Sequence, residues 1–318
     1  IKDAFAKLTE VDYNLSAAGE SRQVIDLIWG AVLTRFISLT SNKTGKEFLS
    51  IGRVQSPTLA LLVEKEKEIQ AFKPKPYWKI IAQLKKEKNF EADHKNGRFW
   101  DEKEVTSIFE KVKDAEEATV TSVKKSKRKE RPPSPFNTTS FIQAASYVRV
   151  SASQAMKTAE ELYMNGLISY PRTDNTVYPK SLDIDEILNT FKNSEFSDDV
   201  DEVLQHRRSQ PTRGKKKTTD HPPIHPVDLP KKPLSGRSKK VYELIVKRFL
   251  ATLSEDALSE TIHATFDIKN EPFKAKGYRL IEPRWRKIYT YIKSKEKPLP
   301  SFEKNDKILV SKMLLKED

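Results

Sequence analysis

The sequence predicts a multidomain α+β protein, and three observations support this class. Helical periodicity recurs at residues 21–37 and 53–72, and strands alternate with a helix from residue 76 and return after residue 256. Two short helices followed by a strand lie between these strand regions. With 318 residues, the chain has the length of about two or three domains. It contains no internal repeat.

Two amphipathic helices are expected in the first region. In residues 21–37, apolar side chains recur on one helical face, and Ser21 is a plausible N-cap. In residues 53–72, Ser56 can cap a second helix, and Pro57 suits its first turn because the missing N–H costs nothing there.

The proline-rich segment 73–78, KPKPYW, marks a boundary, after which the pattern becomes α+β. Residues 77–84 and 117–125 are predicted strands around a helix at about 101–113. The run 124–137 is expected to be a stiff, extended connector, because its prolines exclude a helix. Further strands are predicted at residues 260–269, 272–281 and 285–292.

Two short helices at about 139–148 and 153–164, the second capped by Ser151 or Ser153, lead into a strand at 167–170. This order is the outline of a winged helix-turn-helix.

Two further helices are predicted in the same region, one capped by Ser181 and one at 236–253. Between them, residues 193–220 are polar and rich in turn residues, which favours a mobile loop.

The composition limits the classes of protein. With no Cys, the chain has neither a disulfide framework nor a Cys-ligated zinc, and an intracellular protein is expected. The chain begins at Ile1 without a leader, no apolar run approaches the length of a membrane span, and no membrane partner is expected.

The formal net charge is +13, and residues 1–72 contain nine basic and nine acidic residues, so the surplus lies in the rest of the chain. Such a surplus suits a polyanion, although a soluble, Lys- and Glu-rich surface would also explain it.

Tyr170 and Arg172 form the first candidate site, in the segment GLISYPRTD. Residues i and i+2 of a strand share a face, so Arg172 could hold a phosphate oxygen while the phenol oxygen of Tyr170 attacks phosphorus. A core aromatic followed by a turn with an exposed arginine is the alternative reading.

The second candidate is SIGRVQSPT, residues 50–58. Here Arg53 precedes a helix N-terminus whose free N–H groups attract anions. A phosphate site and an ordinary helix start with a solvated arginine both fit this pattern.

The third candidate is DHPPIHPV, residues 220–227. The prolines exclude a helix that would align His221 and His225, and no third ligand lies nearby, so one imidazole that donates to a phosphate is favoured over zinc. The acidic run 183–186 resembles a magnesium-binding pair, but acidic decoration of a helix start explains it as well.

The order of four motifs resembles that in type IA DNA topoisomerases, and the archaeal and topoisomerase-III-like members in particular. The motifs are SIGRVQSPTLALLVEKEKEI, PPSPFNTTSFIQAAS, ELYMNGLISYPRTD and DHPPIHPV, and the resemblance covers nearly the whole chain.

The resemblance implies an ATP-independent enzyme that cleaves single-stranded DNA through a 5′-phosphotyrosine link, passes a strand and religates the break. Tyr170 matches the tyrosine nucleophile, Arg172 the arginine that stabilises the pentavalent phosphate, and His221 the histidine at the scissile phosphate. Tyr178 is expected to be structural. The residues implied in DNA binding are Arg22, Gln23, Asp26, Ser50, Ile51, Gly52, Arg53, Val54, Gln55 and Arg149.

The resemblance also implies a division of the chain. It gives residues 1–75 as a helical part of the single-strand-binding gate domain, 76–137 and 256–318 as a discontinuous β-rich hinge domain, and 138–255 as an inserted winged-helix-like domain with the catalytic tyrosine.

The family's TOPRIM domain, which holds Mg²⁺, matches nothing in this chain. A central fragment that binds no metal by itself is therefore expected, with the TOPRIM domain on the same parent chain or on a partner. The resemblance further implies an archaeal or bacterial protein of the nucleoid-associated cytoplasm.

Two other functions remain compatible with the residues alone. A non-enzymatic winged-helix DNA-binding protein would explain the basic surplus and would read base edges with its second helix. A magnesium-dependent nuclease would need clustered carboxylates, which the sequence does not contain.

Overall fold

The computed structural model describes residue 5, residue 8, residues 10–293 and residues 295–318. The chain divides into two units, Ile1–Lys75 and Pro76–Asp318, which are described separately below. The prediction for 1–75 extends over some residues outside the described ones. The finer division of the second unit into a hinge and a winged-helix-like domain stays a prediction.

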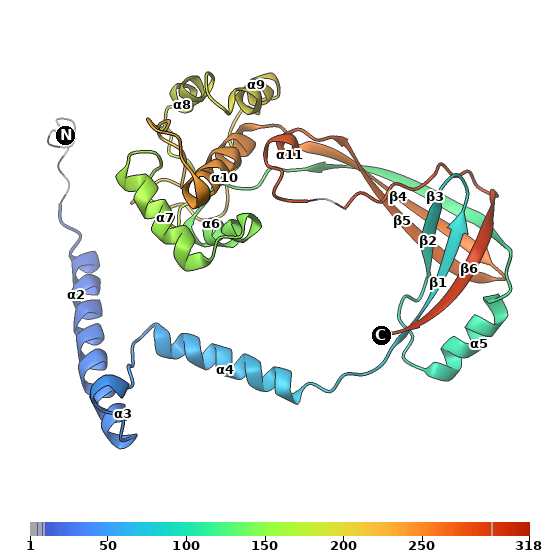
Figure 1. Cartoon of the computed structure of the whole chain (residues 1–318), viewed down its shortest axis with the longest axis horizontal. Helices are drawn as coiled ribbons and strands as arrows, with labels where there is room; N and C mark the ends of the chain where they lie inside the picture. Colours follow the sequence, from blue (N-terminus) through green and yellow to red (C-terminus); the bar gives the residue numbers. More distant parts are fainter. Residues whose placement is uncertain (1–4, 6–7, 9, 294) are drawn as a thin grey trace. The chain divides into compact units, whose positions relative to one another are not determined.

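The first unit is helical (Figure 1). Its elements are α2 Tyr13–Ile28, the π-helical turn η1 Trp29–Leu33, α3 Thr34–Thr40, the 3₁₀ turn η2 Gly45–Glu47 and α4 Gln55–Ala71. Both predicted caps are wrong. Asp12 caps α2 by accepting from the Leu15 N–H at 3.0 Å, so Ser21 lies inside the helix. Ser56 follows the start of α4, where its hydroxyl accepts from the Gly52 N–H at 3.3 Å.

The helical stretch Tyr13–Thr40 is long and apolar enough to cross a membrane by length and composition. Its most apolar part has a mean hydropathy of 1.3, and 6% of that part is buried. The sequence-based search for uninterrupted apolar runs did not find this stretch, because Asp26 and Arg35 divide it. Length and composition alone do not place the helix in a membrane.

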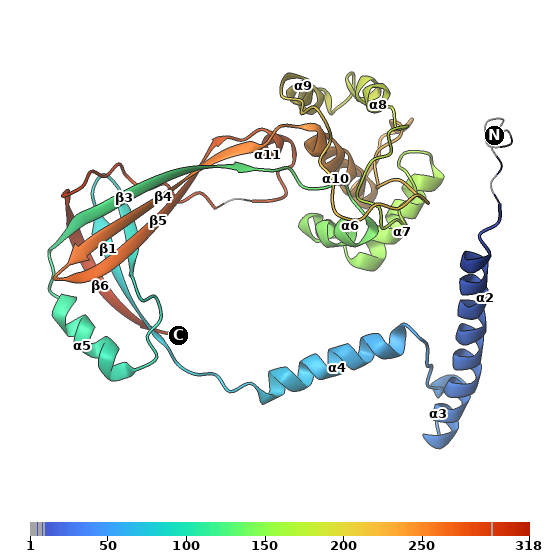
Figure 2. The same cartoon turned by 180° about the vertical axis from the view of Figure 1, so that it is seen from behind.

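Six antiparallel strands of the second unit form a closed barrel in the order β1-β2-β5-β4-β3-β6 (Figures 1 and 2). The strands are β1 Trp78–Lys85, β2 Asn89–His94, β3 Glu117–Glu130, β4 Ala257–Ile268, β5 Glu271–Glu282 and β6 Lys307–Glu317. The helix α5 Glu102–Val112 begins at Asp101, whose carboxylate accepts from the Lys103 N–H at 2.8 Å.

The barrel differs from the sequence-based expectation at three points. β3 continues to Glu130, so the basic half of the expected connector is a strand paired with β4. Residues 285–288 form the short helix α11 Trp285–Ile288 where a strand was predicted. β2 and β6 were not predicted, although β2 and the first half of β6 alternate exposed and buried side chains as a half-buried strand does.

Residues 136–253 form a helical cluster with its own apolar core. Its helices are α6 Thr138–Ala145, the 3₁₀ turn η3 Ser146–Val148, α7 Ala152–Met164, α8 Ile184–Phe191, α9 Ser197–Gln205 and α10 Gly236–Leu253. Asp183 caps α8, not Ser181, because its carboxylate accepts from the Glu186 N–H at 2.9 Å. A mobile loop was predicted for residues 193–220, and this was wrong where α9 forms and buries Val200 and Val203.

Arg248 of α10 joins the helical cluster to the chain that leaves the barrel. Its Nε donates to the Ser134 carbonyl at 2.8 Å, and its guanidinium lies 4.4 Å from the Phe136 ring centroid and 5.2 Å from that of Tyr289. Burial lowers the pKa of this guanidinium, because the side chain is almost wholly removed from water. The connector is therefore fixed to the helical cluster.

Candidate active site

The segment before Tyr170 is held between α7 and the loop that contains both candidate histidines. Gly166 ends the α7 turn with a φ of 75°, which favours glycine. Ser169 then exchanges bonds with the histidine loop: its N–H donates to the His225 carbonyl at 2.9 Å, and its hydroxyl accepts from the His225 N–H at 3.0 Å. Residues 167–170 form one isolated bridge, Ile168 with Pro226, in place of the predicted regular strand.

Tyr170 lies between two rings. Its ring centroid is 5.2 Å from that of Tyr163 on α7, in an edge-to-face contact, and 4.7 Å from the imidazole centroid of His221. The structure describes no hydrogen bond from any described residue to the Tyr170 phenol oxygen. The arrangement fixes the ring and leaves its oxygen available to an incoming group.

Tyr178 has a different environment. Its phenol oxygen is buried, and its ring packs edge-on against His225 and Phe249. Burial raises the pKa of this phenol far above its ordinary value, so a phenolate is strongly disfavoured there. These features suit a structural residue and do not suit a nucleophile.

Arg172 is exposed and points toward α7. Its Nε and Nη2 lie 2.9 and 2.5 Å from one carboxylate oxygen of Glu160. The argument from i and i+2 on one strand face does not apply, because the segment is not a regular strand at this position. A salt bridge to Glu160 therefore orients Arg172.

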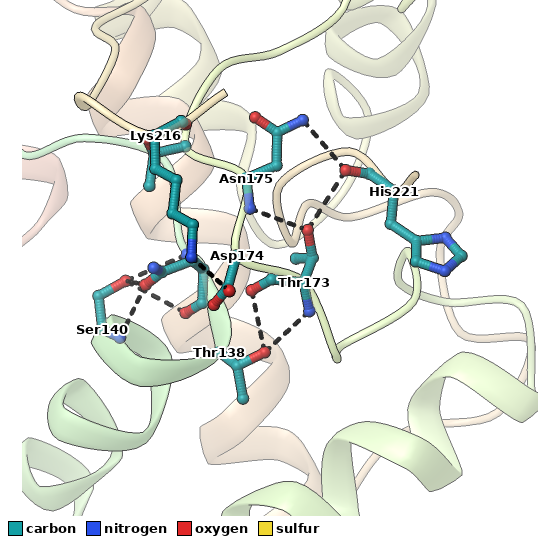
Figure 3. Close-up of polar contacts among 9 residues, drawn as sticks. Thr138, Ser140, Thr173, Asp174, Asn175, Lys216 and His221 are labelled. Atoms are coloured by element: carbon teal, nitrogen blue, oxygen red, sulfur yellow. Dashed lines mark hydrogen bonds and ion pairs between the residues drawn. The ribbon is translucent and has the colours of Figure 1, made fainter. Parts of the chain in front are cut away.

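Hydrogen bonds from side chains to its backbone carbonyl position His221 (Figure 3). The Asn175 amide donates to the His221 carbonyl at 3.0 Å, and the Thr173 hydroxyl donates to the same oxygen at 3.2 Å. Thr138, in the first turn of α6, accepts from the Thr173 N–H at 2.9 Å and so ties the tyrosine loop to the helical cluster. The imidazole itself projects away from this network (Figure 3). Its backbone is fixed while the ring remains accessible.

The basic segment after α9 is anchored beside this network. Lys216 Nζ lies 2.5 Å from an Asp174 carboxylate oxygen, and the Thr176 N–H donates to the Lys216 carbonyl at 2.9 Å. A Cβ at Gly214 would lie 2.5 Å from the Thr176 hydroxyl oxygen, so the close approach of the two segments requires glycine.

In the first unit, the segment before α4 lines a groove of about 660 Å³. Arg53 forms an ion pair with Asp26 of α2 inside it. The Gln55 amide donates to the Ser50 hydroxyl at 2.7 Å, and the Thr34 hydroxyl accepts from the Ile51 N–H at 3.0 Å. The groove is lined by Asp26, Gly52, Arg53, Val54, Gln55, Thr58, Leu59 and Leu62.

The other residues predicted to bind DNA lie apart from that groove lining. Ser50 and Ile51 hold the segment in place, and Arg22 lies 3.9 Å from Asp26, one helical turn away. Gln23 is an exposed side chain of α2. Arg149 is exposed and has a left-handed backbone with a φ of 59°, at the end of η3 in the other unit.

A divalent metal does not fit the described residues. Among them, no three His, Cys, Asp or Glu side chains lie together in a way that could hold an ion.

Sequence reasoning missed four residues of the site: Glu160, Tyr163, Thr138 and Asn175. Glu160 and Tyr163 lie three positions apart on α7, and this helical spacing could have paired them with the segment that follows. Thr138 and Asn175 act through contacts between segments distant in sequence, which no local pattern reveals.

The comparisons with known proteins give the family of this chain. Residues 10–318 match the family model for DNA topoisomerase. DNA topoisomerase 1 of Archaeoglobus fulgidus is 44% identical over 318 residues, which are 100% of this chain and 47% of that protein. DNA topoisomerase 3 of Caenorhabditis elegans is 32% identical over 96% of this chain and 42% of its own length.

A structural comparison agrees with these matches. Full-length topoisomerase I from Thermotoga maritima superimposes with a TM-score of 0.74 at 26% identity, over 100% of this chain and 52% of that one. The chain belongs to the type IA DNA topoisomerase family. It spans about half the length of the curated relatives it matches.

Proposed function

We propose that this chain provides the tyrosine nucleophile and part of the single-strand-binding surface of a type IA DNA topoisomerase. The observation that carries the proposal is the Tyr170 ring, which Tyr163 and His221 hold while its oxygen has no hydrogen bond to a described residue. Arg172, on the same loop, is oriented by Glu160. The parent enzyme would change DNA topology without ATP.

The chemical step conserves the number of phosphodiester-type bonds. The Tyr170 oxygen forms a bond to phosphorus, the bond from phosphorus to O3′ breaks, and the phenol proton is released as the 3′ oxygen gains one. Because the link to the 5′ phosphate keeps the bond energy, attack by the same 3′ hydroxyl restores the strand. Arg172 and His221 would donate to the phosphate oxygens as negative charge grows on them.

The remaining assignments extend the proposal to the parent protein. Arg53 and its groove would contact the backbone of single-stranded DNA, and Arg22, Gln23 and Arg149 would add outer contacts. Mg²⁺ would be held by a TOPRIM domain on the same parent chain or on a partner. Residues 76–137 and 256–318 would act as the hinge around the winged-helix-like 138–255, in a nucleoid-associated cytoplasmic protein.

The deciding experiment replaces Tyr170 with Phe in the parent-length protein. This change keeps the ring contacts with Tyr163 and His221 and removes only the attacking oxygen. Binding of single-stranded DNA should persist, while the covalent adduct through the 5′ phosphate should disappear. Tyr178→Phe is the matched control and should still form the adduct.

Peptide mapping of the adduct separates the outcomes. A nucleotide attached to Tyr170 supports the proposal, and a nucleotide attached to Tyr178 overturns it. Specific binding of duplex DNA through α7, with no adduct in the parent-length protein, would instead support the non-enzymatic winged-helix reading.

A further inference from the structure

Three strands of the barrel continue beyond it as a ribbon. β3 pairs with β6 only through residues 117–119 but with β4 as far as Glu130, and β5 pairs with β2 only at Phe273 and Lys274. Figures 1 and 2 show these strands extending toward the helical cluster. The barrel covers neither face of the ribbon, and the segment that contains Leu299 packs on the face of Gly277.

One face of the ribbon carries a row of basic residues. Lys124 of β3 is directly opposite His263 of β4, which is directly opposite Lys276 of β5. Arg128 and Lys274 lie on the same face, because side chains two and four positions apart share a side of a strand. All five side chains are exposed.

None of these five side chains forms an ion pair within the described part of the chain, although Asp93 of β2 is directly opposite Lys274 and Glu130 lies two positions beyond Arg128. By contrast, Arg279 on the opposite face lies 2.7 Å from Glu260. Lys124 and Lys276 flank His263, and Lys274 lies two positions from Lys276, so positive charges gather on this face and repel one another. Lysine on an open strand edge can prevent unwanted strand pairing, but His263 lies on the central strand, where edge protection has no use.

We propose that this face of the ribbon binds the sugar-phosphate backbone of duplex DNA. A polyanion would offset the repulsion within the row and release its own counterions. Ser126 and Thr261, on the same face, add hydroxyl donors of the kind that contact phosphates.

The lack of an aromatic platform favours duplex over single-stranded DNA. Proteins that bind single strands stack bases on exposed aromatic rings. The described residues of this face include one aromatic side chain, Tyr278, whose hydroxyl donates to Glu130 at 2.9 Å. The face would thus hold a DNA segment other than the strand that Tyr170 cleaves, and its test does not depend on that chemistry.

The test compares two double variants of the same strand in this chain. Lys124→Gln with Arg128→Gln removes two charges from the basic face, and Lys127→Gln with Lys129→Gln removes two from the opposite face. The probes are a relaxed closed duplex plasmid, which has no free ends, and a single-stranded oligonucleotide. Binding is measured at several salt concentrations.

We expect the first variant to bind the plasmid roughly 10-fold more weakly, with a salt slope lower by about 2, because two phosphate contacts are lost. The affinity of the second variant for the plasmid should change by less than about 2-fold, and so should the affinity of both variants for the oligonucleotide. The first variant should also unfold at the same or a higher temperature, since repulsion is removed. Equal losses in both variants, an unchanged affinity in the first, or a parallel loss of single-strand binding would each overturn the proposal.

Discussion

Glu160 of α7 receives both Nε and Nη2 of Arg172 on one carboxylate oxygen, at 2.9 and 2.5 Å. The pair is largely exposed, with 62% of the Arg172 side chain and 41% of the Glu160 side chain accessible to water. An exposed pair of this kind contributes only about 0.2–1 kcal/mol. The salt bridge that orients Arg172 is therefore weak enough for a phosphate to replace Glu160 as the partner of the guanidinium.

Glu160→Gln should tighten the binding of single-stranded DNA by about 2- to 5-fold, because a negative charge is removed beside the proposed phosphate site. Fluorescence anisotropy with a labelled oligonucleotide measures the change. Glu161→Gln, the next residue of the same helix, is the control for net charge and should have a smaller effect. Weaker binding by Glu160→Gln would show that the pair holds Arg172 in its binding position instead of competing with DNA.

Arg53→Ala should weaken the binding of single-stranded DNA by roughly 3- to 10-fold for any sequence, because its proposed contact is to the backbone. The salt slope should fall by about 0.7, the value for one phosphate on a single strand. Arg35→Ala removes the same charge from α3, outside the groove lining, and should bind nearly as well as the unmodified chain. Equal losses in the two variants would mean that only net charge matters in this unit.

Local sequence patterns predicted an element correctly where its apolar residues recur at regular spacing and are also buried. The α10 helix follows its predicted range because apolar residues recur at helical spacing and pack into the core. β2, by contrast, has six residues with only Phe90 and Ala92 as apolar ones, so its strand pattern is short, and pairing within the closed barrel stabilises it. Ser21 has a side chain suited to an N-cap, but the helix begins earlier in the chain, where Asp12 accepts from the Leu15 N–H.

The site shows the same limit. A motif could indicate Tyr170, but the contacts that fix its ring come from Tyr163 and His221. His221 is separated from Tyr170 by the whole segment that contains α8 and α9, and its backbone is held by Asn175. Local sequence carries no information on such contacts, since they depend on how the helices pack.

Acidification should destabilise the chain through His225. Burial lowers the pKa of this imidazole, which is neutral in the folded state and donates from Nδ1 to the Pro223 carbonyl at 2.8 Å. The unfolded chain takes up the proton first, so this contribution to stability is complete above the ordinary pKa of about 6.5 and falls as the pH drops from there toward the folded pKa.

His225→Asn removes the titrating group, so the variant should lose less stability than the unmodified chain between pH 7.5 and 5.5. Urea unfolding at both pH values measures the difference, which has an upper limit of about 1.4 kcal/mol per pH unit for one proton. His94 is also buried with a lowered pKa and is unchanged in both proteins, so its contribution cancels. An identical pH dependence in the two proteins would contradict the prediction.

Arg248→Ala should destabilise the second unit by about 2–4 kcal/mol, because it leaves the Ser134 carbonyl without its donor and opens a cavity beside Phe136 and Tyr289. Removing the buried charge also removes the cost of desolvating it. The loss of stability is therefore smaller than the loss caused by breaking a buried ion pair, which leaves one charge without its partner. Urea unfolding measures the free energy of unfolding directly.

Arg237→Ala, at the exposed start of the same helix, is the control and should change the free energy of unfolding by less than about 0.5 kcal/mol. Similar small losses in both variants would mean that the connector is held by Thr212, which donates to the Pro133 carbonyl at 2.7 Å, and not by Arg248.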